Sequence, residues 1–136
     1  MPGRRIIPGM LLLAVVGLCL ATSGCGGQGP QRHRISGLIT FRGQPVPEGH
    51  IAFDPPDEAG IGGGFAFIRD GRYDTSEAGR GHLGGPHLVR ISGTSGQPQR
   101  ANNPESGSAP LFPTYEVSID LPRRAESRDF EVPINE

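Results

Sequence analysis

The chain has 136 residues, including 22 glycines and 14 prolines, with 35% hydrophobic residues and a formal net charge of -1. This length fits at most one ordinary domain with one small core, and the composition indicates a turn-rich globular fold rather than a disordered chain. All 13 basic residues are arginine, which excludes lysine Schiff-base chemistry and a lysine-containing phosphate loop. Beyond Arg4 and Arg5, 11 arginines (13 minus 2) face 14 acidic residues, so nucleic acid is not expected as a partner.

The first 24 residues have the organisation of a secretory signal peptide. Arg4 and Arg5 supply a positive start, and residues 6–20 form an apolar stretch. That stretch is shorter than the roughly 20 residues that span a bilayer, so it predicts a cleaved signal rather than an anchor helix.

Small residues precede the cysteine that follows this signal. The segment TSGC at residues 22–25 resembles the lipobox of bacterial lipoproteins, in which the cysteine thiol is acylated and the preceding peptide bond is cut. The resemblance implies cleavage between Gly24 and Cys25 and a covalent lipid on Cys25, which would hold the protein on a membrane. The alternatives are an ordinary signal peptide with a free cysteine nearby, or a disulfide between Cys19 and Cys25.

Residues 25–34 are expected to be the lipidated cysteine and a flexible tether, because Gly, Gln and Pro dominate and no apolar period is present. Gly26 stands where an Asp would favour retention at the inner membrane of enterobacteria. We therefore expect a lipoprotein of the cell envelope that faces the periplasm or the cell surface, with the outer membrane favoured.

From residue 35 onward, short alternating runs are separated by turn signals. Residues 35–41 predict a strand with Ile35, Ile39 and Phe41 on one face. The proline-rich segment 42–49 predicts a loop, because proline cannot donate to a central ladder.

The strongest local signal is Asp70-Gly71, which lies between two alternating runs. This pair favours a two-residue type I′ hairpin turn, in which both central residues need a positive φ. The turn sets the register of the hairpin and places Arg69 opposite Arg72.

The same register places Ile68 opposite Tyr73 on the buried face, with Phe65 and Phe67 on the other face, against a neighbouring edge or loop. No segment carries a helical period, and about seven short strands in one antiparallel Greek-key β-sandwich are expected. The other inward-facing residues of these strands are predicted to be Ile51, Phe53, Val89, Ile91, Tyr115, Val117, Ile119, Leu121, Phe130 and Val132.

Three segments together carry a second resemblance: ISGLITFRGQPVPEGHIAF, FIRDGRYDT and GPHLVRISG. They resemble transthyretin-like, carboxypeptidase-regulatory-like sandwich modules. With the lipobox, the LFPTY segment and the terminal DFEVP, the layout is similar to small planctomycete lipoproteins. The resemblance covers about residues 35–134 and implies a structural or interaction role rather than a particular activity.

Motifs for metal or nucleotide binding are weak. Residues 79–84 match G-x-G-x-x-G, but Gly85-Pro86 follows instead of a helix, so a tight loop is the expected use. Asp54, Asp57 and Glu58 lack calcium-loop spacing and are expected to be solvated. The histidines show no metal-site spacing, and we expect His82 to be solvated and His87 to bond a backbone carbonyl at a strand edge; the four are His33, His50, His82 and His87.

Catalysis has no apparent nucleophile, because no G-x-S-x-G elbow is present and Cys25 is expected to be acylated. One enzyme of the transthyretin-like family hydrolyses hydroxyisourate, but its C-terminal Tyr-Arg-Gly-Ser signature is missing here. No metal or cofactor is expected beyond the lipid.

Residues 93–113 form a long segment whose middle has no apolar residue larger than alanine, which predicts a mobile loop. At its exit, Phe112 and Tyr115 either pack on the sandwich or present an aromatic platform to a ligand. Three hypotheses for function follow. The first is a non-catalytic, lipid-anchored envelope module that works by protein contacts, the second a binder of envelope glycans or small ligands, and the third a hydrolase.

Overall fold

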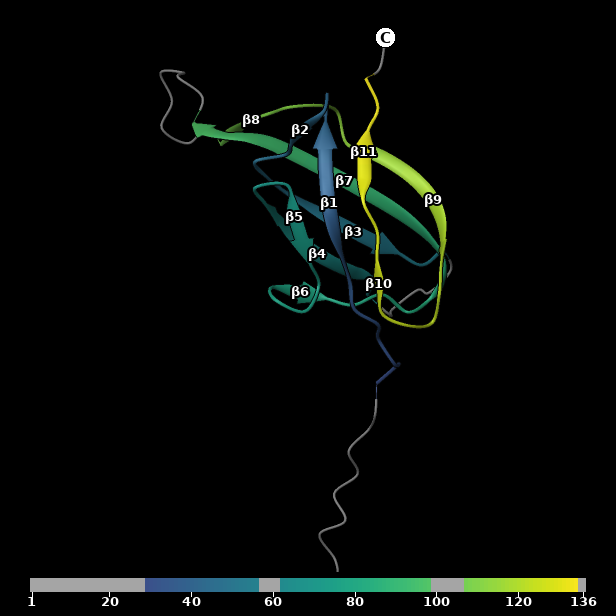
Figure 1. Ribbon diagram of the computed structural model, residues 1–136. Coiled ribbons are helices and arrows are strands. Elements are labelled where there is room, and N and C mark those ends of the chain that lie inside the picture. The colour runs from purple at the N-terminus through teal and green to yellow at the C-terminus, as the bar shows by residue number, and fades with distance from the viewer. Residues whose placement is uncertain (1–28, 57–61, 99–106, 135–136) are drawn as a thin grey trace, which may run out of the picture.

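The computed structural model describes residues 29–56, 62–98 and 107–134, and within these ranges it is all-β, as the sequence predicted (Figure 1). No helix that could cross a membrane occurs in the described part of the chain. The strands are β1 (Ile35–Phe41), β2 (Gln44–Pro45), β3 (Glu48–Asp54), β4 (Gly64–Arg69), β5 (Arg72–Asp74), β6 (Gly79–Arg80), β7 (Gly85–Pro98), β8 (Ser108–Pro110), β9 (Tyr115–Leu121), β10 (Glu126–Ser127) and β11 (Phe130–Val132).

These strands form one curled, mainly antiparallel sheet with the order β10-β1-β5-β4-β3-β7-β8. Off this path, β9 pairs with β7, β6 with β4, and both β2 and β11 with β1. Figure 1 shows how the long β7 crosses the molecule and how the chain returns through β9 toward β1. The curl lets one face of the sheet enclose a core, and it leaves the other face to solvent.

The arrangement departs in two ways from seven antiparallel strands. Eleven strands are present in the described residues, six of which have only two or three residues. In addition, β10 and β11 run parallel to β1, with Ile35 opposite Glu126 and Ile39 opposite Phe130. Parallel neighbours need a long connection. Pairing partners this distant in sequence leave no local signal.

The Asp70-Gly71 turn is confirmed, with φ values of 50° and 76°. The register is also confirmed, since Ile68 pairs with Tyr73 across β4 and β5. The turn is held from outside as well, because the Gly71 amide donates to the carbonyl of Val46 at 2.7 Å.

Segment 42–49 differs from the predicted loop. Arg42 and Gly43 have φ values of 53° and 72°, and they form a second tight turn that pairs Phe41 with Gln44 in β2. Proline fits here because β2 is only two residues long. Val46 then enters the core and is fully buried.

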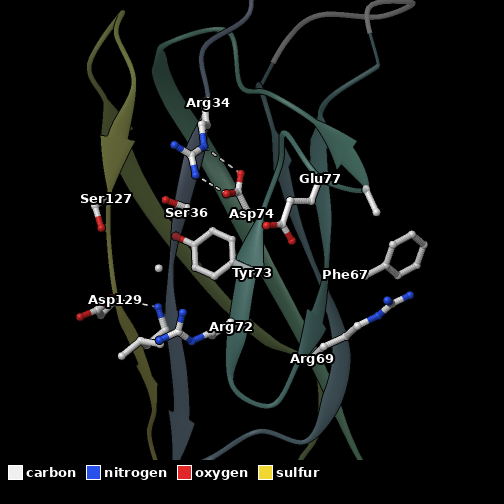
Figure 2. Close-up of a pocket in the computed structure, with 13 residues that line it drawn as sticks. Arg34, Ser36, Phe67, Arg69, Arg72, Tyr73, Asp74, Glu77, Ser127 and Asp129 are labelled. Atoms are coloured by element: carbon white, nitrogen blue, oxygen red, sulfur yellow. Dashed lines mark hydrogen bonds and ion pairs between the residues drawn. The ribbon is translucent and has the colours of Figure 1, made fainter.

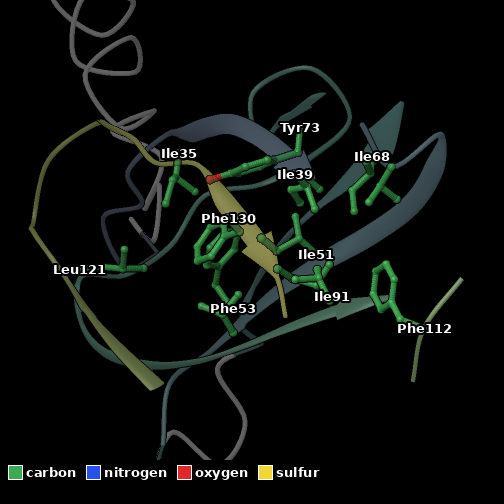
Figure 3. Packing of buried hydrophobic residues seen from close by; sticks show 14 residues of the cluster. Ile35, Ile39, Ile51, Phe53, Ile68, Tyr73, Ile91, Phe112, Leu121 and Phe130 are labelled. Carbon is green, nitrogen blue, oxygen red and sulfur yellow. The ribbon is translucent and has the colours of Figure 1, made fainter. Parts of the chain in front are cut away.

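Burial alternates along β4, with Ala66 and Ile68 inside and Phe65 and Phe67 outside. The predicted inward residues of β3 and β7 are fully buried. On β9 only Leu121 is buried, and the other three predicted residues are partly buried against the core. Figure 3 shows the packed cluster, whose members are Ile35, Ile39, Val46, Ile51, Phe53, Ala66, Ile68, Tyr73, Val89, Ile91, Phe112, Leu121, Phe130 and Val132.

The long loop predicted at residues 93–113 is partly strand. Strand β7 continues to Pro98, and β8 pairs with it at Thr94 and Pro98 with a register shift between them. Backbone pairing needs no apolar side chain, so the polar sequence of this segment gives no signal that it forms strands. Residues 99–106 lie outside the described part.

Contacts with the domain begin before residue 35. Arg32 donates from Nη1 to the carbonyl of Gly81 at 3.0 Å and from Nη2 to that of Gly62 at 2.9 Å. His33 forms a bridge with His82. The end of the predicted tether therefore lies against the domain.

Candidate functional site

The outer face of the sheet carries two exposed phenylalanines on a strand with neighbours on both sides. Phe65 is 38% exposed and Phe67 is 53% exposed, and their rings meet edge to face with centroids 6.1 Å apart. The guanidinium carbon of Arg80 lies 6.0 Å from the Phe65 centroid. Exposed single apolar residues are ordinary, whereas two adjacent aromatic rings make this face a candidate binding surface.

Beside Phe67 the outer face is hollowed into a basin of about 760 Å³, which we call the arginine basin (Figure 2). Its floor is formed by β1, β4 and β5, and residues beside and within β10 close one side. Its charged and aromatic lining residues are Arg34, Phe67, Arg69, Arg72, Tyr73, Asp74, Glu77 and Asp129.

One end of the arginine basin is held by an ion pair between Arg34 and Asp74. The Nε of Arg34 donates to Oδ1 of Asp74 at 2.9 Å, and Nη2 bonds Oδ2. Asp74 also accepts from the amide and the hydroxyl of Ser76, at 2.9 and 2.7 Å. The hydrogen bond from Arg34, together with those from Ser76, holds the pKa of Asp74 well below its ordinary value despite partial burial. This pair is therefore ionised and already satisfied.

The other arginines differ. Arg69 and Arg72 are direct cross-strand partners in β4 and β5, as predicted. Among the described residues, neither has a carboxylate within ion-pair distance. Asp129 also lines the basin, but one of its oxygens accepts the amide of Leu38 at 2.9 Å.

A second, smaller hollow of about 550 Å³ lies on the other side of β4. Phe67 and Arg69 line both hollows, so these two side chains form a ridge between them. On the far side stand Glu48 and His50, which are cross-strand partners of Arg69 and Phe67.

The prediction for His82 is wrong, whereas the backbone-carbonyl contact expected for His87 is present. His82 is fully buried rather than solvated, and its ring centroid lies 5.6 Å from that of His33 and 5.9 Å from that of His87. Its Nδ1 accepts the amide of Gly84 at 3.0 Å. Burial, followed by the neighbouring His87 and His33, lowers the pKa of His82 to about 4. His87 lies with its Nδ1 2.9 Å from the carbonyl of Gly85.

The Nδ1 atoms of His82 and His87 contact neighbouring peptide groups, so these two rings organise backbone turns. No three side chains of histidine, cysteine, aspartate or glutamate are placed to hold a metal ion in residues 29–56, 62–98 and 107–134.

The aromatic residues singled out at the loop exit lie inward. Phe112 is 7% exposed, and its ring centroid lies 5.0 Å from that of Phe41. Tyr115 is partly buried against the same core. Both side chains thus pack against the core cluster and do not form an aromatic platform for a ligand.

The predicted lipidation and cleavage residues, Cys25 and Gly24, lie outside the described residues, as do Asp57 and Glu58. Asp54 is described and pairs with Arg90, whose Nε donates to Oδ2 at 2.9 Å. The turn residues Asp70 and Gly71 lie at the end of the second hollow, where Asp70 is among its lining residues.

Sequence reasoning missed the arginine basin, although the signal was present. The alternation of FAFIRD places Phe65, Phe67 and Arg69 on one solvent face. The basin also needs Asp129 beside β1, and this follows from parallel pairing that the sequence does not reveal.

No protein-family model, curated protein or solved structure matches this chain. The sequence signals near Cys25 and the residues of the outer face are therefore what a function can be inferred from.

Proposed function

We propose that this chain is a non-catalytic, lipid-anchored protein of the bacterial cell envelope, with the outer membrane as the favoured site. The support is the order of a positive start, a short apolar stretch and the TSGC segment ending at Cys25. The proposal includes a transthyretin-like, carboxypeptidase-regulatory-like sandwich for residues 35–134, supported by the quoted motifs and the all-β sheet.

The domain would act by contacts with envelope proteins through its outer face. The observation that carries this role is the exposed pair Phe65 and Phe67 on β4. Exposed aromatic rings beside arginine side chains are typical of the central part of protein interfaces, where both residue types are enriched. Strand β4 already pairs with β3, β5 and β6, so a partner would use the side chains rather than extend the sheet.

The anchor is tested by the intact mass of the membrane-extracted protein beside a Cys25→Ala variant followed by fractionation. We expect a chain that begins at Cys25 with added acyl mass, and release of the variant from the membrane. A soluble wild-type protein with a free thiol would contradict the anchor.

The contact role is tested by a photo-crosslinking amino acid at Phe67 in cells, with the same group at Asp120 as control. Asp120 is exposed on β9, away from the residues that line the basin. A discrete protein adduct from position 67 but not from position 120 supports the role. Equal adducts from both positions would contradict it.

A second candidate is binding of an envelope glycan or small ligand. The arginine basin favours it, because an aromatic ring, arginines, carboxylates and the hydroxyls of Ser36 and Ser127 converge on one hollow. Adducts that lack protein mass, or a saturable response to saccharides, would distinguish this candidate from the first.

A further inference from the structure

Arg69 and Arg72 place two positive charges side by side on the outer face. They lie directly opposite each other across β4 and β5, and like charges in this position repel, whereas Glu48 is the partner of Arg69 on the β3 side. Figure 2 shows that their side chains diverge, Arg72 toward the side of Asp129 and Arg69 toward the side of Phe67. No carboxylate of the described residues is within ion-pair distance of either. An anionic group bound between or beside them would offset the repulsion.

The rest of the lining restricts what can carry that anion. Phe67 and Leu38 are 53% and 44% exposed, so the ligand has an apolar face. The carboxylates Asp74, Glu77 and Asp129 also line the basin. Carboxylates only accept hydrogen bonds and guanidinium groups only donate them, whereas a sugar hydroxyl does both.

Other anions fit less well. A peptide rich in acidic residues would meet repulsion from the three lining carboxylates. It could not add a strand to β4 either, since β4 pairs with β3 on one side and with β5 and β6 on the other. One isolated anionic group among hydroxyls, on a ring with an apolar face, satisfies all of these features.

We propose that the arginine basin binds a saccharide that carries a carboxylate, with Arg69 contacting the carboxylate and Phe67 packing against the sugar ring. This proposal rests on the ligand-binding candidate above and names its class of ligand. The ridge formed by Phe67 and Arg69 between the two hollows would let a saccharide chain continue past β4.

Calorimetric titration of the full membrane-extracted protein in detergent tests this class. The probes are a short oligogalacturonide, an oligosaccharide of hyaluronan, and the methyl ester of the oligogalacturonide, which has the same rings without the charge. We expect saturable binding of at least one acidic probe. For the galacturonide, we expect binding about tenfold or more weaker after esterification, because a charge-assisted hydrogen bond is lost.

Two variants locate the contact. Arg69→Gln keeps hydrogen-bond donors but removes the charge, and we expect it to weaken the acidic probe about tenfold and the ester little. Phe67→Ala should weaken both forms. Arg124→Gln is the matched control, since Arg124 is exposed and does not line the basin. Circular dichroism confirms that each variant is folded.

The outcomes separate this proposal from those on which it rests. Equal affinity for acid and ester would refute the carboxylate and leave sugar binding. Absence of binding to both acidic probes, or no effect of Arg69→Gln, would overturn the proposal. Glycerol phosphate serves as a lipid-headgroup probe, and tighter, Arg69-dependent binding of it would assign the basin to phosphate instead. The anchor is judged independently by the Cys25→Ala fractionation.

Discussion

His33 and His82 exchange two backbone hydrogen bonds, from the His33 amide to the His82 carbonyl at 2.8 Å and in return at 3.0 Å. This bridge joins the residues just before β1 to the loop before β7. Gly81 permits the approach, because a Cβ there would lie 2.3 Å from the His33 carbonyl oxygen. The segment leading from the proposed anchor is thus fastened beside a buried, titratable ring.

Acid should destabilise the protein through His82. Its pKa is about 4 in the folded protein and 6.5 ordinarily, so the unfolded chain binds a proton before the folded chain does. Stability is therefore present above about pH 6.5 and falls until about pH 4, by at most about 3 kcal/mol. The charged or titratable groups that affect this ring are His33, His87 and Glu126. Urea unfolding at about pH 7 and pH 4.5 measures the loss.

The control for this window is His82→Asn, which retains an acceptor for the Gly84 amide. We expect it to be less stable near neutral pH, with a smaller change between the two pH values. An unchanged pH dependence would show that another group is responsible. Asp74 affects stability in a separate pH range. Its pKa is lowered in the folded protein, so its ionised form stabilises the fold above about pH 4, and this contribution is lost only at lower pH.

The turn between β4 and β5 should be sensitive to a side chain at position 71. Gly71 has a φ of 76°, and a Cβ there would lie 2.6 Å from the Cβ of Pro45. Gly71→Ala should lower the free energy of unfolding by about 1–3 kcal/mol. Asp70→Gly, at a φ of 50°, should cost far less. Denaturant unfolding compares the two, and equal losses would contradict the backbone explanation.

This hairpin also shows what the sequence could predict. Asp70-Gly71 is a local signal, and the alternation on both sides of it determines which residues face inward. The all-β class, the Ile68–Tyr73 register and the inward residues of β3, β4 and β7 follow from such local patterns.

Other features depend on contacts between distant segments. The parallel pairing of β10 and β11 with β1 has no local signature. His82 was expected in solvent, but the His33 ring from before β1 and the His87 ring in β7 both pack against it. The arginine basin likewise combines β4 and β5 with residues about 50 positions further along the chain. The alternation of residues along a strand identifies its solvent-exposed face, but not the distant segments that lie next to that face.

Truncation to alanine should cost much stability at the buried aromatic ring and little at the exposed one. Phe53 is fully buried, so Phe53→Ala removes packing and leaves a cavity, at a cost of about 3–5 kcal/mol. Phe67 is 53% exposed, so Phe67→Ala should change stability by no more than about 0.5 kcal/mol. Thermal and denaturant unfolding provide both values. A large loss in Phe67→Ala would assign this ring a structural role and weaken its assignment to a binding surface.

The seam between β1 and the C-terminal segment depends on a missing side chain. A Cβ at Gly37 would lie 2.0 Å from the carbonyl oxygen of Arg128, and that oxygen accepts the Tyr73 hydroxyl at 2.6 Å. Gly37→Ala must therefore separate the two segments or bend them, and it should cost at least about 2 kcal/mol of unfolding free energy. At Gly107 a Cβ meets open space, so Gly107→Ala should stay within about 0.5 kcal/mol of the wild type. Denaturant unfolding of both variants gives the comparison. Equal stability of the two would mean that the C-terminal segment is not seated against β1 as the structure places it.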